Sequence, residues 1–158
     1  MSLSIKDKLK TKIALYEHCQ QYIQSLLADA RRGIDESRAA ANLEEKSSAG
    51  DKFETHRAMM HLQMESFIKR RRVAEDQETQ LLSLQIKSMS HVQLGALVTT
   101  DQRNYFIAVS APAVVIDGTS YICLSTAAPL FLAMRGLSAE DWIEWGDDEE
   151  GIEILSIH

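Results

Sequence analysis

The feature that most constrains the fold is a stripe of apolar residues that recurs at alternating intervals of three and four over residues 9–41. This spacing is typical of a helix that pairs with another helix in a coiled coil. No proline interrupts the stretch, and Gln20 and Ser37 occupy the two seam positions that are not apolar. The seam residues are Leu9, Ile13, Tyr16, Ile23, Leu27, Ala30, Ile34 and Ala41. A helix of about 38 residues, roughly 55 Å long, needs a partner along this side.

A second helical stretch, over residues 51–84, supplies that partner. Asp51 and Glu54 form an Asp-x-x-Glu variant of the capping box, which indicates a helix start. Arg71 and Glu78 interrupt its weaker seam, which is formed by Met60, Met64, Phe67, Ala74 and Leu81. Two arms of similar length joined by a short polar turn favour antiparallel pairing. We therefore predict a long antiparallel coiled-coil hairpin over residues 1–87, with its tip near residues 42–54.

From about Met89 the helical period gives way to β-branched runs separated by turn residues. The Asp117-Gly118 pair between two such runs is a strong hairpin signal. Pro129 in the first turn and Gly136 just past the end predict one short helix between them. The expected strands cover residues 93–100, 105–109, 113–116, 120–124, 141–145 and 151–157. The sequence thus predicts an α+β protein in which residues 88–158 form a small antiparallel sheet with one short helix.

Charge is distributed unevenly along the chain, whose net charge is −6. Residues through Lys87 carry 15 Lys and Arg against 13 Asp and Glu, and those from Ser88 onward carry 2 against 10. The two parts therefore have net charges of +2 and −8, which suggests two units with different neighbours. The net negative charge of the chain makes a free-standing nucleic-acid-binding protein an unfavoured interpretation.

The chain offers no apolar run long enough to cross a bilayer and no signal-peptide pattern at its N-terminus. Its two cysteines, Cys19 and Cys123, lie far apart and fit neither a metal quartet nor a disulfide scaffold. We therefore expect a protein of the reducing cytoplasm with no membrane partner.

Three groups of side chains are candidates for function. The acidic tip residues Glu44, Glu45 and Asp51 either form a solvated bend, with Asp51 as a helix cap, or help to hold a metal. Trp142 and Trp145 are three apart on one expected strand, so one should lie in the core and the other should be an exposed docking residue.

The third group is a basic run in the second arm, formed by Lys69, Arg70, Arg71 and Arg72. It is either a charged helix face or a patch that faces RNA or a protein partner, through phosphate contacts that salt would weaken. Four consecutive positions cover all sides of a helix, so one of them should lie at the seam.

Residues 125–143 follow, without a gap, a pattern close to Ser-x-x-Ser-Pro-Leu-x-x-Ala-Leu-x-Gly-x-x-x-Gly-Asp-x-Val. The matched positions are Ser125, Pro129, Leu130, Ala133, Gly136 and Asp141, and the replaced ones are Ala128, Met134, Glu140 and Ile143. In this pattern, and in the helical hairpin that precedes it, the chain resembles the Gre family of bacterial transcript-cleavage factors.

The resemblance implies an FKBP-like second domain that docks at the rim of the secondary channel of RNA polymerase, while the hairpin tip reaches toward the active centre. The chain would not be an enzyme itself; it would at most stimulate RNA cleavage by the polymerase. We expect it to be a monomer that binds no cofactor stably, shares Mg²⁺ with the polymerase through its tip acids, and meets the RNA 3′ end only within the complex. The implied docking residues are Ser125, Pro129, Leu130, Gly136 and Trp142.

The tip departs from the Gre pattern. When Phe53 is aligned with the tyrosine of that pattern, its two working acidic positions fall on Lys46 and Ala49. Two interpretations therefore stay open, a factor that assists cleavage through nearby carboxylates and one that only occupies the channel. Two other classes are also open: an FKBP-like isomerase or chaperone, and a coiled-coil adaptor that dimerises through its hairpin.

Overall fold

The structure is a computed structural model that describes residues 4–45, 51–147 and 151–158, without the side chains of residues 44, 45 and 51–53. The chain folds into two compact units. The first, which we call the sheet unit, combines Met1–Tyr22 with Gln80–His158, and the second, the arm unit, is Ile23–Thr79. The predicted boundary between residues 87 and 88 lies inside the sheet unit.

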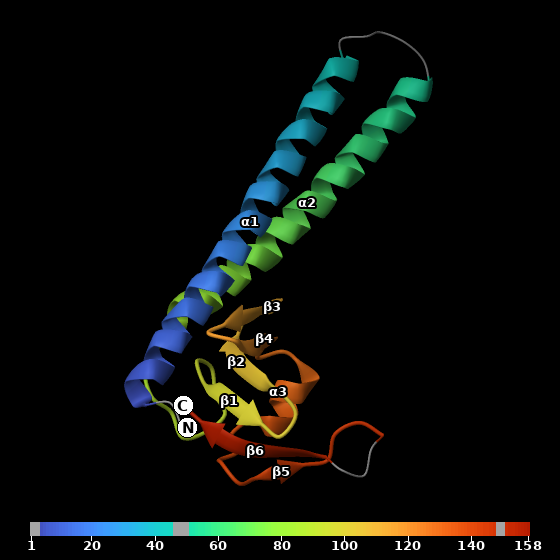
Figure 1. The fold of residues 1–158 in the computed structure, drawn as a ribbon. Coiled ribbons are helices and arrows are strands. Elements are labelled where there is room, and N and C mark those ends of the chain that lie inside the picture. Colours follow the sequence, from blue (N-terminus) through green and yellow to red (C-terminus); the bar gives the residue numbers. More distant parts are fainter. Residues whose placement is uncertain (1–3, 46–50, 148–150) are drawn as a thin grey trace. The chain divides into compact units, whose positions relative to one another are not determined.

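Two long helices precede the strands in the described chain (Figure 1). The helices are α1 (Ile5–Glu45), α2 (Asp51–Ser83) and the short α3 (Pro129–Met134). The strands are β1 (Leu97–Thr100), β2 (Asn104–Ala108), β3 (Ala111–Ile116), β4 (Thr119–Ser125), β5 (Trp142–Ile143) and β6 (Ile152–Ile157). The predicted α+β class is confirmed. None of the described helices is long and apolar enough to cross a membrane.

In the arm unit, α1 and α2 run side by side in opposite directions (Figure 1). The predicted seam is buried along α1 at Ile23, Ala30, Ile34 and Ala41. Ser37, the polar seam position, is also buried at 4% exposure. An apolar stripe that repeats every three or four residues is buried here because a second helix covers it along its length.

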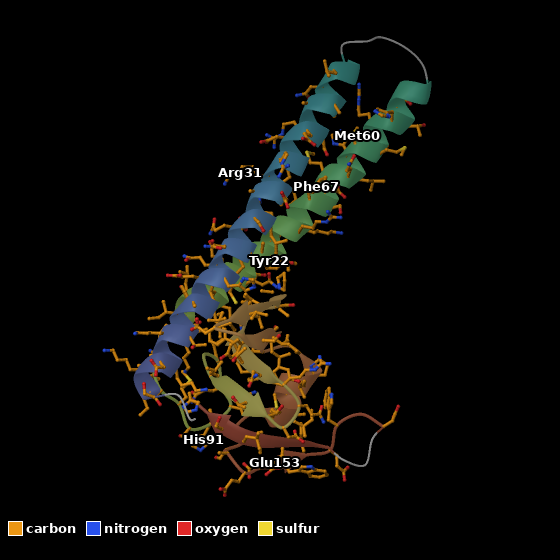
Figure 2. The ribbon with its side chains drawn as sticks, viewed as in Figure 1. Tyr22, Arg31, Met60, Phe67, His91 and Glu153 are labelled. Atoms are coloured by element: carbon orange, nitrogen blue, oxygen red, sulfur yellow. The ribbon has the colours of Figure 1, made fainter. Side chains whose placement is uncertain are left out.

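Gly33 lies at a close approach between the two helices of the arm unit. A Cβ atom at this position would overlap with the ring of Phe67 on α2, which Figure 2 labels between the helices. The glycine therefore makes room for an aromatic ring at the seam, which explains why the first arm tolerates its helix-weakening residue.

We expect Gly33→Ala to lower the free energy of unfolding by about 1–2 kcal/mol, because crowding against Phe67 outweighs the gain in helix propensity. Urea unfolding followed by far-UV circular dichroism measures the change. The double variant Gly33→Ala/Phe67→Leu should regain most of the loss, since the smaller side chain frees the space. Equal stability of Gly33→Ala and wild type would contradict this packing.

The sheet unit contains a sheet with strand order β3-β4-β2-β1-β6-β5. Its pairs are antiparallel except for β2 and β4, which are parallel. The predicted all-antiparallel sheet is therefore wrong at this one pair. The β3–β4 hairpin turns at Asp117 and Gly118, whose φ angles of 50° and 79° fit the predicted tight turn. The chain reverses direction between β2 and β3 and again at the β3–β4 hairpin, so β4 runs in the same direction as β2.

One face of the sheet packs on α3 and on the loop before β1. Its central residues are Val98, Ile107 and Ile154, which meet Phe131 and Met134 of α3. On the opposite face, the register places Leu97, Phe106 and Cys123 in a row across β1, β2 and β4. All three of these side chains are buried.

The first part of α1 covers this opposite face. Its buried residues are Thr11, Lys12, Leu15 and Cys19, whereas Ile13 is 47% exposed and Gln20 is exposed. The predicted seam is therefore wrong before residue 22. The physical reason is that α1 packs here on a sheet, so a different stripe of the helix turns inward.

Candidate functional site

The five predicted docking residues all belong to the sheet unit, around the end of β4, α3 and β5. Ser125 ends β4, and its hydroxyl accepts a hydrogen bond from the amide of Ala127 at 3.1 Å. Its carbonyl accepts a second one from the amide of Ala128 at 3.0 Å. Ser125 thus builds the turn that leads into α3. Pro129 is the first residue of α3, a position where the amide hydrogen that proline lacks would have no partner within the helix.

Gly136 closes the other end of α3. Its φ angle of 79° is one that glycine adopts without strain. Its amide donates to the carbonyl of Val92 at 2.9 Å, and the amide of Val92 donates to the carbonyl of Leu137 at 2.9 Å. Leu130 packs against the core beneath. Ser125, Leu130 and Gly136 therefore shape this surface, while Pro129 is exposed on it.

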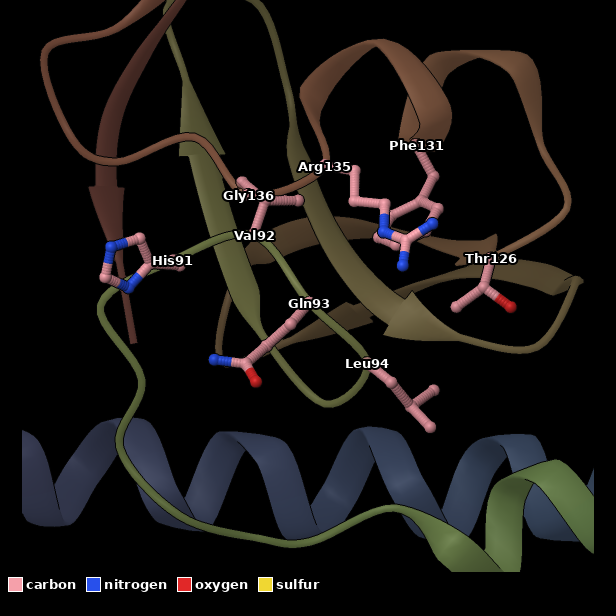
Figure 3. Close-up of a pocket in the computed structure, with 8 residues that line it drawn as sticks. All are labelled: His91, Val92, Gln93, Leu94, Thr126, Phe131, Arg135 and Gly136. Carbon is pink, nitrogen blue, oxygen red and sulfur yellow. The ribbon is translucent and has the colours of Figure 1, made fainter.

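A cavity of about 670 Å³ lies beside α3 (Figure 3). One wall comes from the loop before β1 and the other from residues 125–143, which we call the Gre-like segment. The lining residues are His91, Val92, Gln93, Leu94, Thr126, Phe131, Arg135 and Gly136. Thr126 is held by a hydrogen bond from the side-chain amide of Gln80. The sequence missed the first wall, since residues 93–96 were predicted as strand and instead form a loop that bends at Gly95 with a φ angle of 91°.

Trp142 lies at the far edge of the sheet, on β5 opposite Glu153 of β6. A Cβ atom on Gly151 would overlap with the indole of Trp142 and with the carbonyl oxygen of Ile143, so one side of the ring rests on bare backbone. Trp142 is nevertheless 49% exposed, and Trp145 is 38% exposed. The prediction that one of the two tryptophans enters the core is wrong, because β5 ends at Ile143 and Trp145 lies beyond it.

Acidic residues lie close to this exposed tryptophan in the sequence and opposite it on β6. The chain from Gly136 to its end contains no Lys or Arg, but it contains acidic residues that include Glu140, Asp141, Glu144 and Glu153. All four of these are exposed. An exposed aromatic ring among carboxylates can bind a Lys or Arg side chain through cation–π and ionic contacts.

Comparisons with known proteins give matches among solved structures only. No protein-family model matches the chain, and no curated protein matches it. Among solved structures, the chain is similar to GreA factor homolog 1 (Gfh1) of Thermus thermophilus, with 21% identity over 90% of this chain and 94% of that one and a TM-score of 0.32. A structure described as the transcription factor Gfh1 matches with 20% identity over 89% and 93% and a TM-score of 0.34.

The chain is similar to Gre-type factors.

A Gre-type function would involve the acidic tip, whose backbone is described only in part. Glu44 and Glu45 end α1 and Asp51 begins α2, but their side chains lie outside the described residues. The intervening Lys46 and Ala49 lie outside them altogether. Over the described residues, no group of three or more His, Cys, Asp or Glu side chains is arranged to hold a metal ion. A shared Mg²⁺ at the tip stays a prediction.

The basic run lies on α2 within the arm unit, and Lys69, Arg70, Arg71 and Arg72 are all exposed. The guanidinium of Arg70 lies 5.1 Å from the ring centroid of Phe67. The Nε of Arg71 lies 3.7 Å from the Oε1 of Glu75. Arg71 also lines a groove of about 340 Å³ between α1 and α2. Lys69 and Arg72 are three residues apart, so they lie next to each other on another side of the helix. The run therefore presents cations around α2 and not on one flat face.

Lys12 is a charged residue whose position the sequence did not reveal. Its side chain is fully buried beneath α1, and its Nζ donates to the carbonyl of Lys87 at 2.6 Å. Burial lowers the pKa of Lys12 to about 8. The pKa of His158 is lowered by burial and by the positive charges of Lys8 and Lys12.

Proposed function

We propose that this chain is a Gre-type transcription factor that binds RNA polymerase in the cytoplasm. The observation that carries the proposal is that one chain combines a two-helix arm with a sheet unit. A two-helix arm ends in acidic residues, and a sheet unit presents the Gre-like segment of residues 125–143 around α3 and β5. A two-helix arm is narrow enough to enter a channel, and the sheet unit would dock outside that channel.

The docking surface is the exposed side of the Gre-like segment, from Pro129 on α3 to Trp142 on β5. Pro129 and Trp142 are exposed, and Leu132 between them is 57% exposed. Aromatic anchors seated on rigid backbone are common energetic centres of protein interfaces. The acidic residues around Trp142 favour a basic segment of the polymerase as the contact.

At the tip of the arm, Glu44, Glu45 and Asp51 would supply a carboxylate to a Mg²⁺ held mainly by the polymerase. Mg²⁺ prefers oxygen ligands and keeps several waters, so one added carboxylate is enough to hold a second ion. Two such ions stabilise the attacking and leaving oxygens of RNA hydrolysis. The factor would therefore stimulate cleavage and would not be an enzyme by itself.

A second candidate, a factor that occupies the secondary channel without cleavage, is favoured by the residues at two tip positions. Lys46 and Ala49 stand where the Gre pattern has its working acids. A lysine there would repel a metal cation, and an alanine offers it no ligand. Binding to the polymerase is common to both candidates.

The test uses stalled, backtracked elongation complexes from the host of this protein. We expect the full chain to shorten the RNA, and Glu44→Gln/Glu45→Gln/Asp51→Asn to slow this roughly 100-fold while binding is retained, because the amides keep the shape but hold the metal weakly. RNA that stays intact while the chain binds would establish the second candidate. A chain that does not bind the polymerase would overturn both.

The docking surface is tested separately by the binding affinity for the polymerase. We expect Trp142→Ala to weaken binding at least about 10-fold, as for a buried aromatic anchor in an interface. Val115→Ala is the matched control, since Val115 is 65% exposed on the edge strand β3. Equal affinity of both variants and wild type would place docking elsewhere.

A further inference from the structure

The cavity beside α3 is a feature of the sheet unit that the proposed function does not use. Its volume of about 670 Å³ lies within the range of small-molecule sites. Val92 and Phe131, which are buried at 1% and 5% exposure, form its inner part. Gln93 and Arg135 are exposed at its rim. An apolar floor below a polar rim suits a ligand that has one apolar and one polar end.

The two walls of this cavity are joined by backbone hydrogen bonds. The amide of Gly136 donates to the carbonyl of Val92, and the amide of Val92 donates to the carbonyl of Leu137, both at 2.9 Å. Where the loop before β1 bends, the amide of Gly95 donates to the carbonyl of Ile107 at 2.7 Å. The cavity is therefore formed before any ligand arrives, and binding requires little ordering of the backbone.

Arg135 gives the cavity a positive charge that no described residue neutralises. Its guanidinium forms no hydrogen bond or ion pair with any residue that the structure describes. In Figure 3 it points into the cavity, toward the side that Leu94 and Thr126 line. From Ser88 onward the chain has one other Lys or Arg, which is Arg103 in the turn between β1 and β2, away from the cavity lining. None of the described lining residues is acidic, so the cavity favours an anionic group.

Two neutral side chains in the lining supply further hydrogen-bonding groups. The hydroxyl oxygen of Thr126 accepts a hydrogen bond from the side-chain amide of Gln80, so the Thr126 hydroxyl hydrogen is left to donate to a ligand. The side-chain amide of Gln93 has no partner among the described residues. The planar fork of the Arg135 guanidinium fits the two oxygens of a carboxylate, and a hydroxyl donor beside it adds a third hydrogen bond.

We propose that this cavity binds a small molecule that carries one carboxylate on an apolar body. The carboxylate pairs with Arg135 and Thr126, and the apolar body lies against Leu94 and Phe131. A ligand with several negative charges, such as a nucleoside triphosphate, is disfavoured, because residues 88–158 carry 2 Lys and Arg against 10 Asp and Glu. The inference does not depend on polymerase binding, and its experiment contains no polymerase.

The experiment titrates 3-phenylpropionate into the full chain at neutral pH and constant ionic strength, followed by ¹H–¹⁵N NMR spectra. We expect the amide signals of Leu94, Thr126 and Arg135 to shift together, with a Kd on the order of 1 mM for so small a ligand. The uncharged 3-phenylpropanamide has nearly the same shape and should bind about 10-fold more weakly. The proposal is overturned if 3-phenylpropionate shifts none of these signals at up to about 20 mM, or if the amide binds as tightly.

Two variants separate a specific contact from general attraction by charge. Arg135→Gln should weaken binding of 3-phenylpropionate about 10-fold, because it removes the charged partner of the carboxylate. Arg103→Gln is the matched control, since it removes the same charge from the same unit at an exposed position outside the cavity lining, and it should change the Kd by less than about twofold. Equal weakening by both variants would overturn the proposed site. Tighter binding of the doubly charged phenyl phosphate than of 3-phenylpropionate would overturn the assignment of a carboxylate ligand.

Discussion

Gly151→Ala is expected to lower the free energy of unfolding of the sheet unit by about 3 kcal/mol. The added Cβ atom would overlap with the indole of Trp142 and with the carbonyl oxygen of Ile143. The carbonyl belongs to the neighbouring strand β5, so relief requires the β5–β6 pair to separate. The φ angle of 58° at Gly151 adds the strain of a left-handed conformation. Urea unfolding followed by tryptophan fluorescence reports on this edge directly, because both tryptophans of the chain lie there.

Gly146→Ala is the matched control for this prediction. Gly146 has a φ angle of 79°, but a Cβ atom there would meet nothing within 4 Å. Its substitution should therefore cost only the backbone strain, about 1 kcal/mol. If the two variants lose the same stability, the contact between Trp142 and the backbone of Gly151 is not what holds this edge. Gly151→Ala should also weaken polymerase binding, since it displaces the proposed aromatic anchor.

Lys12→Met is expected to stabilise the chain near neutral pH and to abolish part of its pH dependence. The pKa of Lys12 is lowered from 10.5 to about 8 by burial, so the folded state holds the proton less tightly than the unfolded state. Below about pH 8 both states are protonated, and the folded state carries the full cost of the buried charge. Between about pH 8 and 10.5 the unfolded state binds more protons, so stability rises with pH by at most about 1.4 kcal/mol per unit.

The measurement is the difference in unfolding free energy between Lys12→Met and wild type, taken from pH 7 to pH 11 by urea titration. We expect the variant to be the more stable protein at pH 7, and this advantage to shrink as pH rises through the window of about 8 to 10.5. Lys10→Met serves as the comparison, because Lys10 is exposed on the same helix. A difference that does not change with pH would show that Lys12 ionises alike in both states.

Sequence patterns predicted the elements of this fold well where local chemistry decides them. The hairpin turn at Asp117 and Gly118 and the short helix from Pro129 follow from residues with strong backbone preferences. The seam from Ile23 to Ala41 was predicted because apolar residues spaced three and four apart form a stripe that a second helix can bury. The Gre-like segment was likewise visible in order along the chain, because its residues are contiguous.

What the sequence determined by itself is the set of local structures: two long helices, the strands and the segment around α3. The tertiary structure alone decided which stripe of α1 turns inward before residue 22 and that Lys12 is buried. It also decided that Trp142 rests on Gly151 and stays exposed. The reason is that these features depend on contacts between residues far apart in the chain, which a local period or turn signal does not encode.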